Sequence, residues 1–237
     1  AGLDVRGRGL IVPVSRGVLY ADDPWEAAQE IRDRINRARV FAPHCDLVLG
    51  LFEADCVQFG QFTLASGQTS PIYVDLRRVI SYPSLFHSVV DAYVDLVRPL
   101  RYDRLAAVPY AALPATAAVA MALDAPLIYP RKEVKDHGTG RAVEGAFERG
   151  QRAVAVEDVV TSGGSLLRAI GSMQEAGLVV RDAVVLVDRE QGGRERLADA
   201  GITLHAVLTL NEILSVLRDE DRISAETFAE VQAYLAS

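Results

Sequence analysis

The chain has 237 residues, of which 50% are hydrophobic and 24% are charged, and its formal net charge is −7. A chain of this size can bury a substantial core, and no apolar run reaches the length of a membrane span. Net acidity argues against a nucleic-acid-binding regulator. The two cysteines, Cys45 and Cys56, provide neither a zinc quartet nor a disulfide framework. We therefore expect reduced thiols on a helical segment of a cytoplasmic protein.

The first 40 residues predict one strand and one helix, which form an N-terminal extension. Residues 10–14 have the apolar pattern of a strand, and a helix follows, with Asp23 as its cap and Pro24 in its first turn. Apolar residues recur at helical spacing and form one face of this helix, namely Trp25, Ala28, Ile31, Ile35 and Ala38. Such a face packs against a partner surface, and the plainest partner is the core of the same chain.

The rest of the chain alternates strands with helices. Expected strands cover 105–108, 126–129, 153–156, 183–187 and 203–208. Helical patterns lie near 83–98, 112–122, 164–176 and 192–200, followed by 210–217 and 225–235. This order predicts an α/β fold with a mainly parallel sheet, whose ligands bind at the carboxyl ends of the strands.

The segment 153–165 reads AVAVEDVVTSGGS and carries the strongest chemical signal. A short apolar run ends in Glu157 and Asp158, and a small-residue turn then leads into a helical pattern. Backbone N–H groups of such a turn bind phosphate at the positive end of the helix dipole, and the acids suit sugar hydroxyls. No Walker A sequence is present, and the acids precede the glycines, unlike the dinucleotide fingerprint. The alternative is an ordinary strand-turn-helix with incidental acids, although unpartnered acids at a strand end are costly.

This segment resembles the PRPP-binding motif of the type I phosphoribosyltransferases. Three further segments resemble orotate phosphoribosyltransferase: the hairpin FGQFTLASGQTSPIYVDLR at 59–77, the basic loop YPRKEVKDHG at 129–138, and VDREQGG at 187–193. The resemblance spans about residues 41–237, taken as the transferase domain. It implies the type I phosphoribosyltransferase fold, with a central, mainly parallel sheet flanked by helices and a small N-terminal hood over the site.

The resemblance also implies which residues bind each substrate. The segment 108–114, VPYAALP, is similar to the family's pyrophosphate turn, although a plain strand-to-helix turn is an alternative. Orotate would contact Tyr73, Val74, Thr161 and Arg189. PRPP would contact Tyr110, Ala111, Arg131, Lys132, Lys135, His137, Glu157, Asp158, Val159, Val160, Thr161, Ser162, Gly163, Gly164 and Ser165.

The implied reaction displaces pyrophosphate from C1 of PRPP by a ring nitrogen of orotate, giving orotidine 5′-monophosphate. Lys135 is expected to stabilise the developing charge on pyrophosphate, and Asp158 to orient the ribose. The basic loop is expected to close over the leaving group and to serve the partner's site in a homodimer. Mg²⁺ is expected as the cofactor, held mainly by PRPP and water rather than by a protein cage.

Ala65 stands where many family members have lysine, so one candidate contact to substrate is missing. A phosphoribosyltransferase for a purine base, or a PRPP-binding regulator without turnover, are the alternatives. The basic loop and the Arg189 segment favour the enzyme.

The N-terminal segment 12–21, VPVSRGVLYA, resembles the end of orotidine 5′-monophosphate decarboxylase. Arg16 stands where that family grips the product phosphate. One βα unit cannot close an eight-stranded barrel, and the decarboxylase Lys/Asp cluster is absent from this sequence. We therefore expect residues 1–40 to be the end of a decarboxylase fused to the transferase at 41–237, as in a uridine monophosphate synthase, without decarboxylation by this chain alone.

Overall fold

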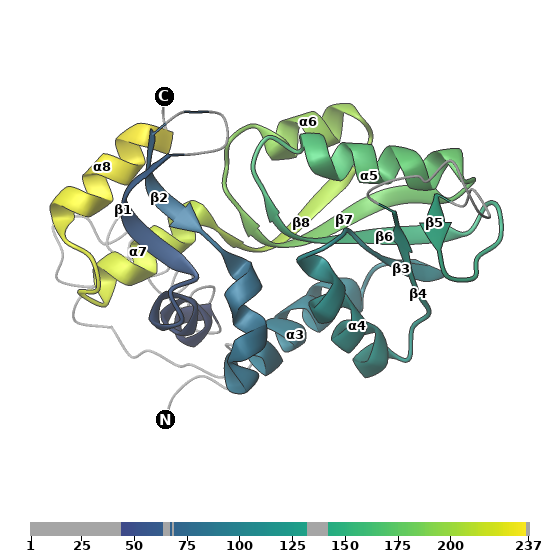
Figure 1. The fold of residues 1–237 in the computed structure, drawn as a ribbon, viewed down its shortest axis with the longest axis horizontal. Helices are drawn as coiled ribbons and strands as arrows, with labels where there is room; N and C mark the ends of the chain where they lie inside the picture. The colour runs from purple at the N-terminus through teal and green to yellow at the C-terminus, as the bar shows by residue number, and fades with distance from the viewer. Residues whose placement is uncertain (1–43, 64–66, 68, 132–141, 236–237) are drawn as a thin grey trace, which may run out of the picture.

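The computed structural model describes residues 44–63, 67, 69–131 and 142–235. The predicted strand and helix of residues 1–40 lie outside this part, as do Ala65, Lys132, Lys135 and His137. The described chain forms an α/β core with a smaller unit at one side (Figure 1).

The core is a six-stranded sheet in the order β5-β4-β3-β6-β7-β8. Its strands are β3 (Arg104–Ala107), β4 (Leu127–Pro130), β5 (Val143–Glu144), β6 (Arg152–Val160), β7 (Val179–Asp188) and β8 (Thr203–Thr209). All neighbours are parallel except β4 and β5. The five predicted strands are confirmed. β5 was not predicted, because its two residues are too few to show a period.

Helices cover both faces of the sheet, as Figure 1 shows. α3 (Pro83–Val97) and α4 (Ala112–Leu123) pack on one face, and α5 (Gly164–Glu175) and α6 (Gly193–Asp199) on the other. The alternation of side chains along β6 supplies both cores: Val154 and Val156 join the first, and Ala153 and Ala155 join the second. In the described part of the chain, no helix is both long enough and apolar enough to cross a membrane.

The smaller unit contains the predicted hairpin and the two C-terminal helices. β1 (Val57–Thr63) pairs antiparallel with β2 (Thr69–Val74), and the 3-10 helix η1 (Leu76–Ser81) follows. A helix over 44–53, α7 (Leu210–Asp219) and α8 (Ala225–Leu235) pack with the hairpin on the α3 side of the core. The prediction that both cysteines lie on a helix is wrong for Cys56, which follows a turn and directly precedes β1. Its side chain is fully buried, as expected of a structural thiol.

Candidate active site

The two predicted acids lie inside β6 rather than at its end. The strand continues through Val160, four residues past the end of the predicted strand 153–156, because it keeps pairing with β7 as far as Asp188. Glu157 is only 8% exposed, and its Oε1 accepts a hydrogen bond from the Asp158 backbone N–H at 3.0 Å. Burial, followed by the neighbouring Asp158, raises the pKa of Glu157 to about 9. Glu157 therefore holds a proton near neutral pH in the free protein.

The turn after β6 has the geometry of a phosphate loop. Gly163 is the N-cap of α5 with φ of 73°, a left-handed conformation that glycine adopts without a steric cost. Thr161, Ser162 and Ser165 are exposed, whereas the side chain of Val160 is buried in the core. The first N–H groups of this 12-residue helix have no partner within the helix, and such groups can bind an anion.

Arg189 lies one strand away, directly after β7, and its backbone N–H donates to the Val160 carbonyl at 2.9 Å. Its side chain is buried, and within the described residues its Nε and Nη2 have no hydrogen-bond partner. Burial lowers the pKa of Arg189 from its ordinary value, an effect partly offset by Tyr234 of α8. A buried guanidinium with free donors is costly unless a ligand pairs with it.

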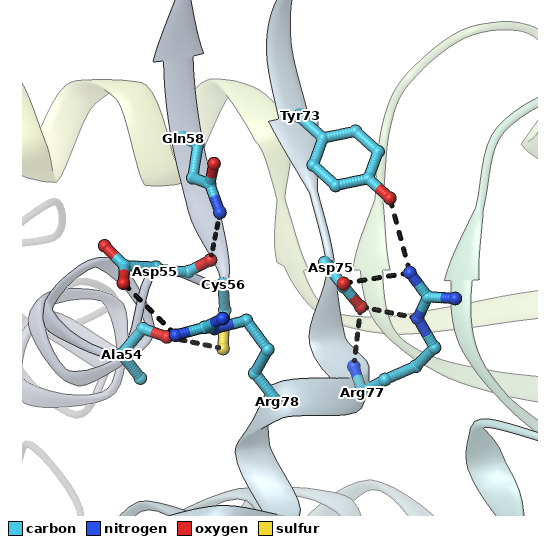
Figure 2. Close-up of polar contacts among 8 residues, drawn as sticks. All are labelled: Ala54, Asp55, Cys56, Gln58, Tyr73, Asp75, Arg77 and Arg78. Atoms are coloured by element: carbon cyan, nitrogen blue, oxygen red, sulfur yellow. Dashed lines mark hydrogen bonds and ion pairs between the residues drawn. The ribbon is translucent and has the colours of Figure 1, made fainter. Parts of the chain in front are cut away.

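Tyr73 and Val74 are the last two residues of β2 in the hairpin. Both are half-buried in β2, against which α8 packs, and Tyr73 stacks on Phe62 with ring centroids 5.4 Å apart. Arg77 Nη2 donates to Tyr73 Oη at 3.3 Å, and Arg77 is held by Asp75 through Nε–Oδ1 at 2.6 Å (Figure 2). The hydrogen bonds from Arg77 lower the pKa of Asp75. Sequence reasoning did not find this support of the tyrosine.

A second ion-pair group anchors the strand end beside the tyrosine. Arg78 Nε donates to the Ala54 carbonyl at 2.8 Å, and its Nη2 lies 3.2 Å from Asp55 Oδ2, as Figure 2 shows. Gln58 at the start of β1 donates to the Asp55 carbonyl at 2.9 Å. These contacts connect η1 and the start of β1 to the turn that follows the helix over 44–53.

The predicted pyrophosphate turn connects β3 to α4. It contains a cis peptide bond between Pro109 and Tyr110, and Tyr110 is 65% exposed. Ala111 is the N-cap of α4, so its neighbourhood also presents helix N–H groups. Arg131, expected to bind pyrophosphate, forms an ion pair with Glu144 of β5, in which Arg131 Nε lies 2.5 Å from Glu144 Oε1.

A cavity of about 410 Å³ lies on the α5 side of the sheet. Its lining includes the turn after β3, Arg131 after β4, Glu157 of β6 and the first turns of α5. Arg168 of α5 also lines it, and sequence reasoning missed this residue because a single arginine on a helix carries no signal. The structure thus gathers Glu157, Ser165 at the start of α5 and Arg131 around one cavity.

Anion-binding turns at the carboxyl ends of parallel strands, together with an acid pair and a hairpin, define the phosphoribosyltransferase class. Residues 100–205 match the family described as "Phosphoribosyl transferase domain". The bifunctional enzyme PyrF/PyrE of Nostoc sp. is 40% identical over 98% of this chain and 53% of its own length. An orotate phosphoribosyltransferase of Caenorhabditis elegans is 36% identical over 81% of this chain and 85% of its own length.

The structure of Leishmania donovani UMP synthase superposes with a TM-score of 0.79 at 39% identity, over 100% of this chain and 52% of that one. The chain therefore belongs to the orotate phosphoribosyltransferase family. It spans about half the length of the Nostoc and Leishmania proteins.

Proposed function

We propose that the chain transfers the 5-phosphoribosyl group from PRPP to orotate, giving orotidine 5′-monophosphate and pyrophosphate in pyrimidine nucleotide synthesis. The observation that carries this proposal is Arg189, which directly follows β7 beside the phosphate loop. Its guanidinium is buried, and its Nε and Nη2 have no hydrogen-bond partner among the described residues. A planar fork of donors suits the carboxylate and carbonyl of orotate. The relatives with this activity in their names support the same assignment.

In this proposal the 5′-phosphate of PRPP binds the turn 161–165 at the start of α5. Glu157 and Asp158 meet the ribose hydroxyls, where the protonated Glu157 donates a hydrogen bond and Asp158 accepts one. Orotate lies between Arg189 and Tyr73. With both substrates held in line, the remaining barrier falls mainly by placement and by stabilisation of the leaving pyrophosphate.

The basic loop completes the proposed site. Arg131 is expected to exchange Glu144 for the pyrophosphate, and Lys135 to stabilise the charge that develops on it. Pyrophosphate binding by Lys132, Lys135 and His137, which lie outside the described residues, is carried over from the family resemblance. A Mg²⁺ ion accompanying PRPP would take its oxygens from the diphosphate and water, since hard oxygen ligands suit it.

We also propose that the chain works as a homodimer in the cytoplasm, with the basic loop of one subunit reaching the site of its partner. This arrangement follows from the family resemblance. It predicts that neither subunit forms a complete site alone.

The deciding experiment mixes the chain with Mg²⁺, PRPP and orotate and follows the loss of orotate absorbance. We expect turnover that requires all three components, and release of one pyrophosphate per orotate consumed. Turnover with a purine base but not with orotate would refute the assignment. Binding of PRPP without turnover of any base would instead favour a regulator.

A further inference from the structure

Two turns of the proposed site touch each other directly through their backbones. The phosphate turn at Thr161–Gly163 lies against Gly193, the first residue of α6 and the end of the segment that begins with Arg189. A Cβ built on Gly193 would lie 2.4 Å from the Thr161 carbonyl oxygen and 3.3 Å from the Gly163 nitrogen. A Cβ on Gly163 would lie 3.2 Å from the Gly193 carbonyl oxygen. The contact is therefore tight from both sides.

Gly193 and its neighbour Gly192 need glycine for different reasons. Gly192 has φ of 80°, but its Cβ would meet nothing within 4 Å. Gly193 is buried and is not among the residues with positive φ, so only the lack of space requires glycine there. Because the nearest atom is a backbone oxygen, a methyl group at 193 cannot be accommodated by rotation of a side chain.

The segment that carries Arg189 is itself firmly held. Asp188, which is 1% exposed, accepts from the Glu190 N–H at 2.9 Å and pairs with Arg194 at 3.0 Å. Glu190 accepts from the Asn211 N–H of α7 at 2.9 Å. Arg189 N–H is tied to the Val160 carbonyl at the start of the phosphate turn. Because these contacts fix the segment that carries Arg189 and Gly193, a side chain added at Gly193 would displace the phosphate turn instead.

From these contacts we infer that Gly193 is a positioning residue, which sets the distance between the 5′-phosphate turn and Arg189. The inference rests on the proposed function, because it takes these turns as the sites of PRPP and orotate. Reaction requires the two substrates to be placed within a fraction of an ångström, so a fixed backbone contact between their sites contributes directly to rate. Gly193 itself touches neither substrate.

The test compares Gly193→Ala with Gly171→Ala in the full chain. Gly171 lies in α5, and its Cβ would meet nothing within 4 Å. We expect Gly193→Ala to lower kcat/KM for PRPP by about ten-fold or more, with kcat also reduced, because the phosphate turn is pushed away from Arg189. Gly171→Ala should keep both constants. A Gly193→Ala enzyme that unfolds at a lower temperature but retains both kinetic constants would overturn the positioning role.

A measurement on the unmodified chain covers the case in which Gly193→Ala fails to fold. Orotate added alone should slow amide hydrogen exchange in residues 161–165, since the two turns are in rigid contact. Unchanged exchange there, with orotate bound, would overturn the inference. If the unmodified chain shows no turnover or orotate binding, the proposed function fails. Binding of inorganic phosphate then decides the role of Gly193: weaker binding to Gly193→Ala supports it, and equal binding refutes it.

Discussion

Glu157 shows how the environment of one side chain changes its chemistry. As a carboxyl at the surface it would ionise near 4.5, but within β6 its pKa rises to about 9, first through burial and then through Asp158. Between these two values the unfolded chain binds fewer protons than the folded chain. The free energy of unfolding therefore decreases as pH rises from about 4.5 to about 9.

The first prediction concerns Glu157→Gln. Glutamine cannot ionise, so the variant should lose less stability than the wild type as pH rises from about 5 to about 9. Thermal unfolding of both proteins across this range measures the difference, which should reach a few degrees at the alkaline end. Glu148→Gln, at an exposed position, is the control and should follow the wild type. Parallel curves for Glu157→Gln and the wild type would contradict the assignment of a buried, protonated carboxyl.

The second prediction contrasts two neighbouring arginines with opposite surroundings. Arg189 is buried and its Nε and Nη2 find no partner in the described part of the chain, whereas Arg194 pairs with the buried Asp188. Arg189→Met should raise the free energy of unfolding by roughly 1 kcal/mol and abolish orotate binding, because it removes a desolvated charge kept for the ligand. Arg194→Met should lower stability, since it leaves Asp188 buried without its charged partner. Denaturant unfolding and orotate calorimetry measure both effects, and a less stable Arg189→Met protein would refute the argument.

At the scale of elements, the start of α7 holds the Arg189 segment in place. Thr209 and Glu212 form a capping box. Thr209 Oγ1 accepts a hydrogen bond from the Glu212 N–H at 3.2 Å, and the Thr209 N–H donates to Glu212 Oε2 at 2.6 Å. The N–H of Asn211, in the first turn of α7, donates to Glu190, which lies in the loop after β7. Since α7 offers its orphan N–H groups to that loop, helix and loop stabilise each other.

The third prediction follows from this cap. Thr209→Ala should lower the free energy of unfolding by about 1 kcal/mol. Ser215→Ala is the control in the same helix. The Ser215 hydroxyl donates back to the Asn211 carbonyl one turn earlier, and its loss should cost less than about 0.5 kcal/mol. Urea unfolding of the three proteins provides the comparison. Equal losses for the two variants would show that the cap contributes nothing specific.

At the scale of the whole molecule, the proposed homodimer makes a prediction about mixed subunits. Lys135→Ala and Asp158→Asn should each be nearly inactive alone, Lys135→Ala mainly through kcat and Asp158→Asn through weaker PRPP binding. If Lys135 serves the partner's site, mixing the two variants should restore up to about a quarter of wild-type activity, from one intact site in half of the dimers. No recovery, despite exchange of subunits shown by mass spectrometry, would place Lys135 in its own subunit's site.

Patterns in the chain predicted much of the fold and the outline of the site. Short apolar runs between helical patterns located five of the six strands of the central sheet, and the small residues at 161–165 marked the turn into α5, because both signals are local. Local patterns failed where pairing decided the outcome. β6 extends past its acids because β7 runs beside it, and β5 exists only because β4 offers it an edge.

The sequence by itself determined the class of chemistry, since acids, small-residue turn and basic segments occur in an order that few sites share. Only the tertiary structure decided how those parts work together. The protonation of Glu157, the free donors of Arg189 and the requirement for glycine at 193 all depend on atoms from separate segments. Burial and backbone contact between such segments arise only when the chain is folded, so no local pattern encodes them.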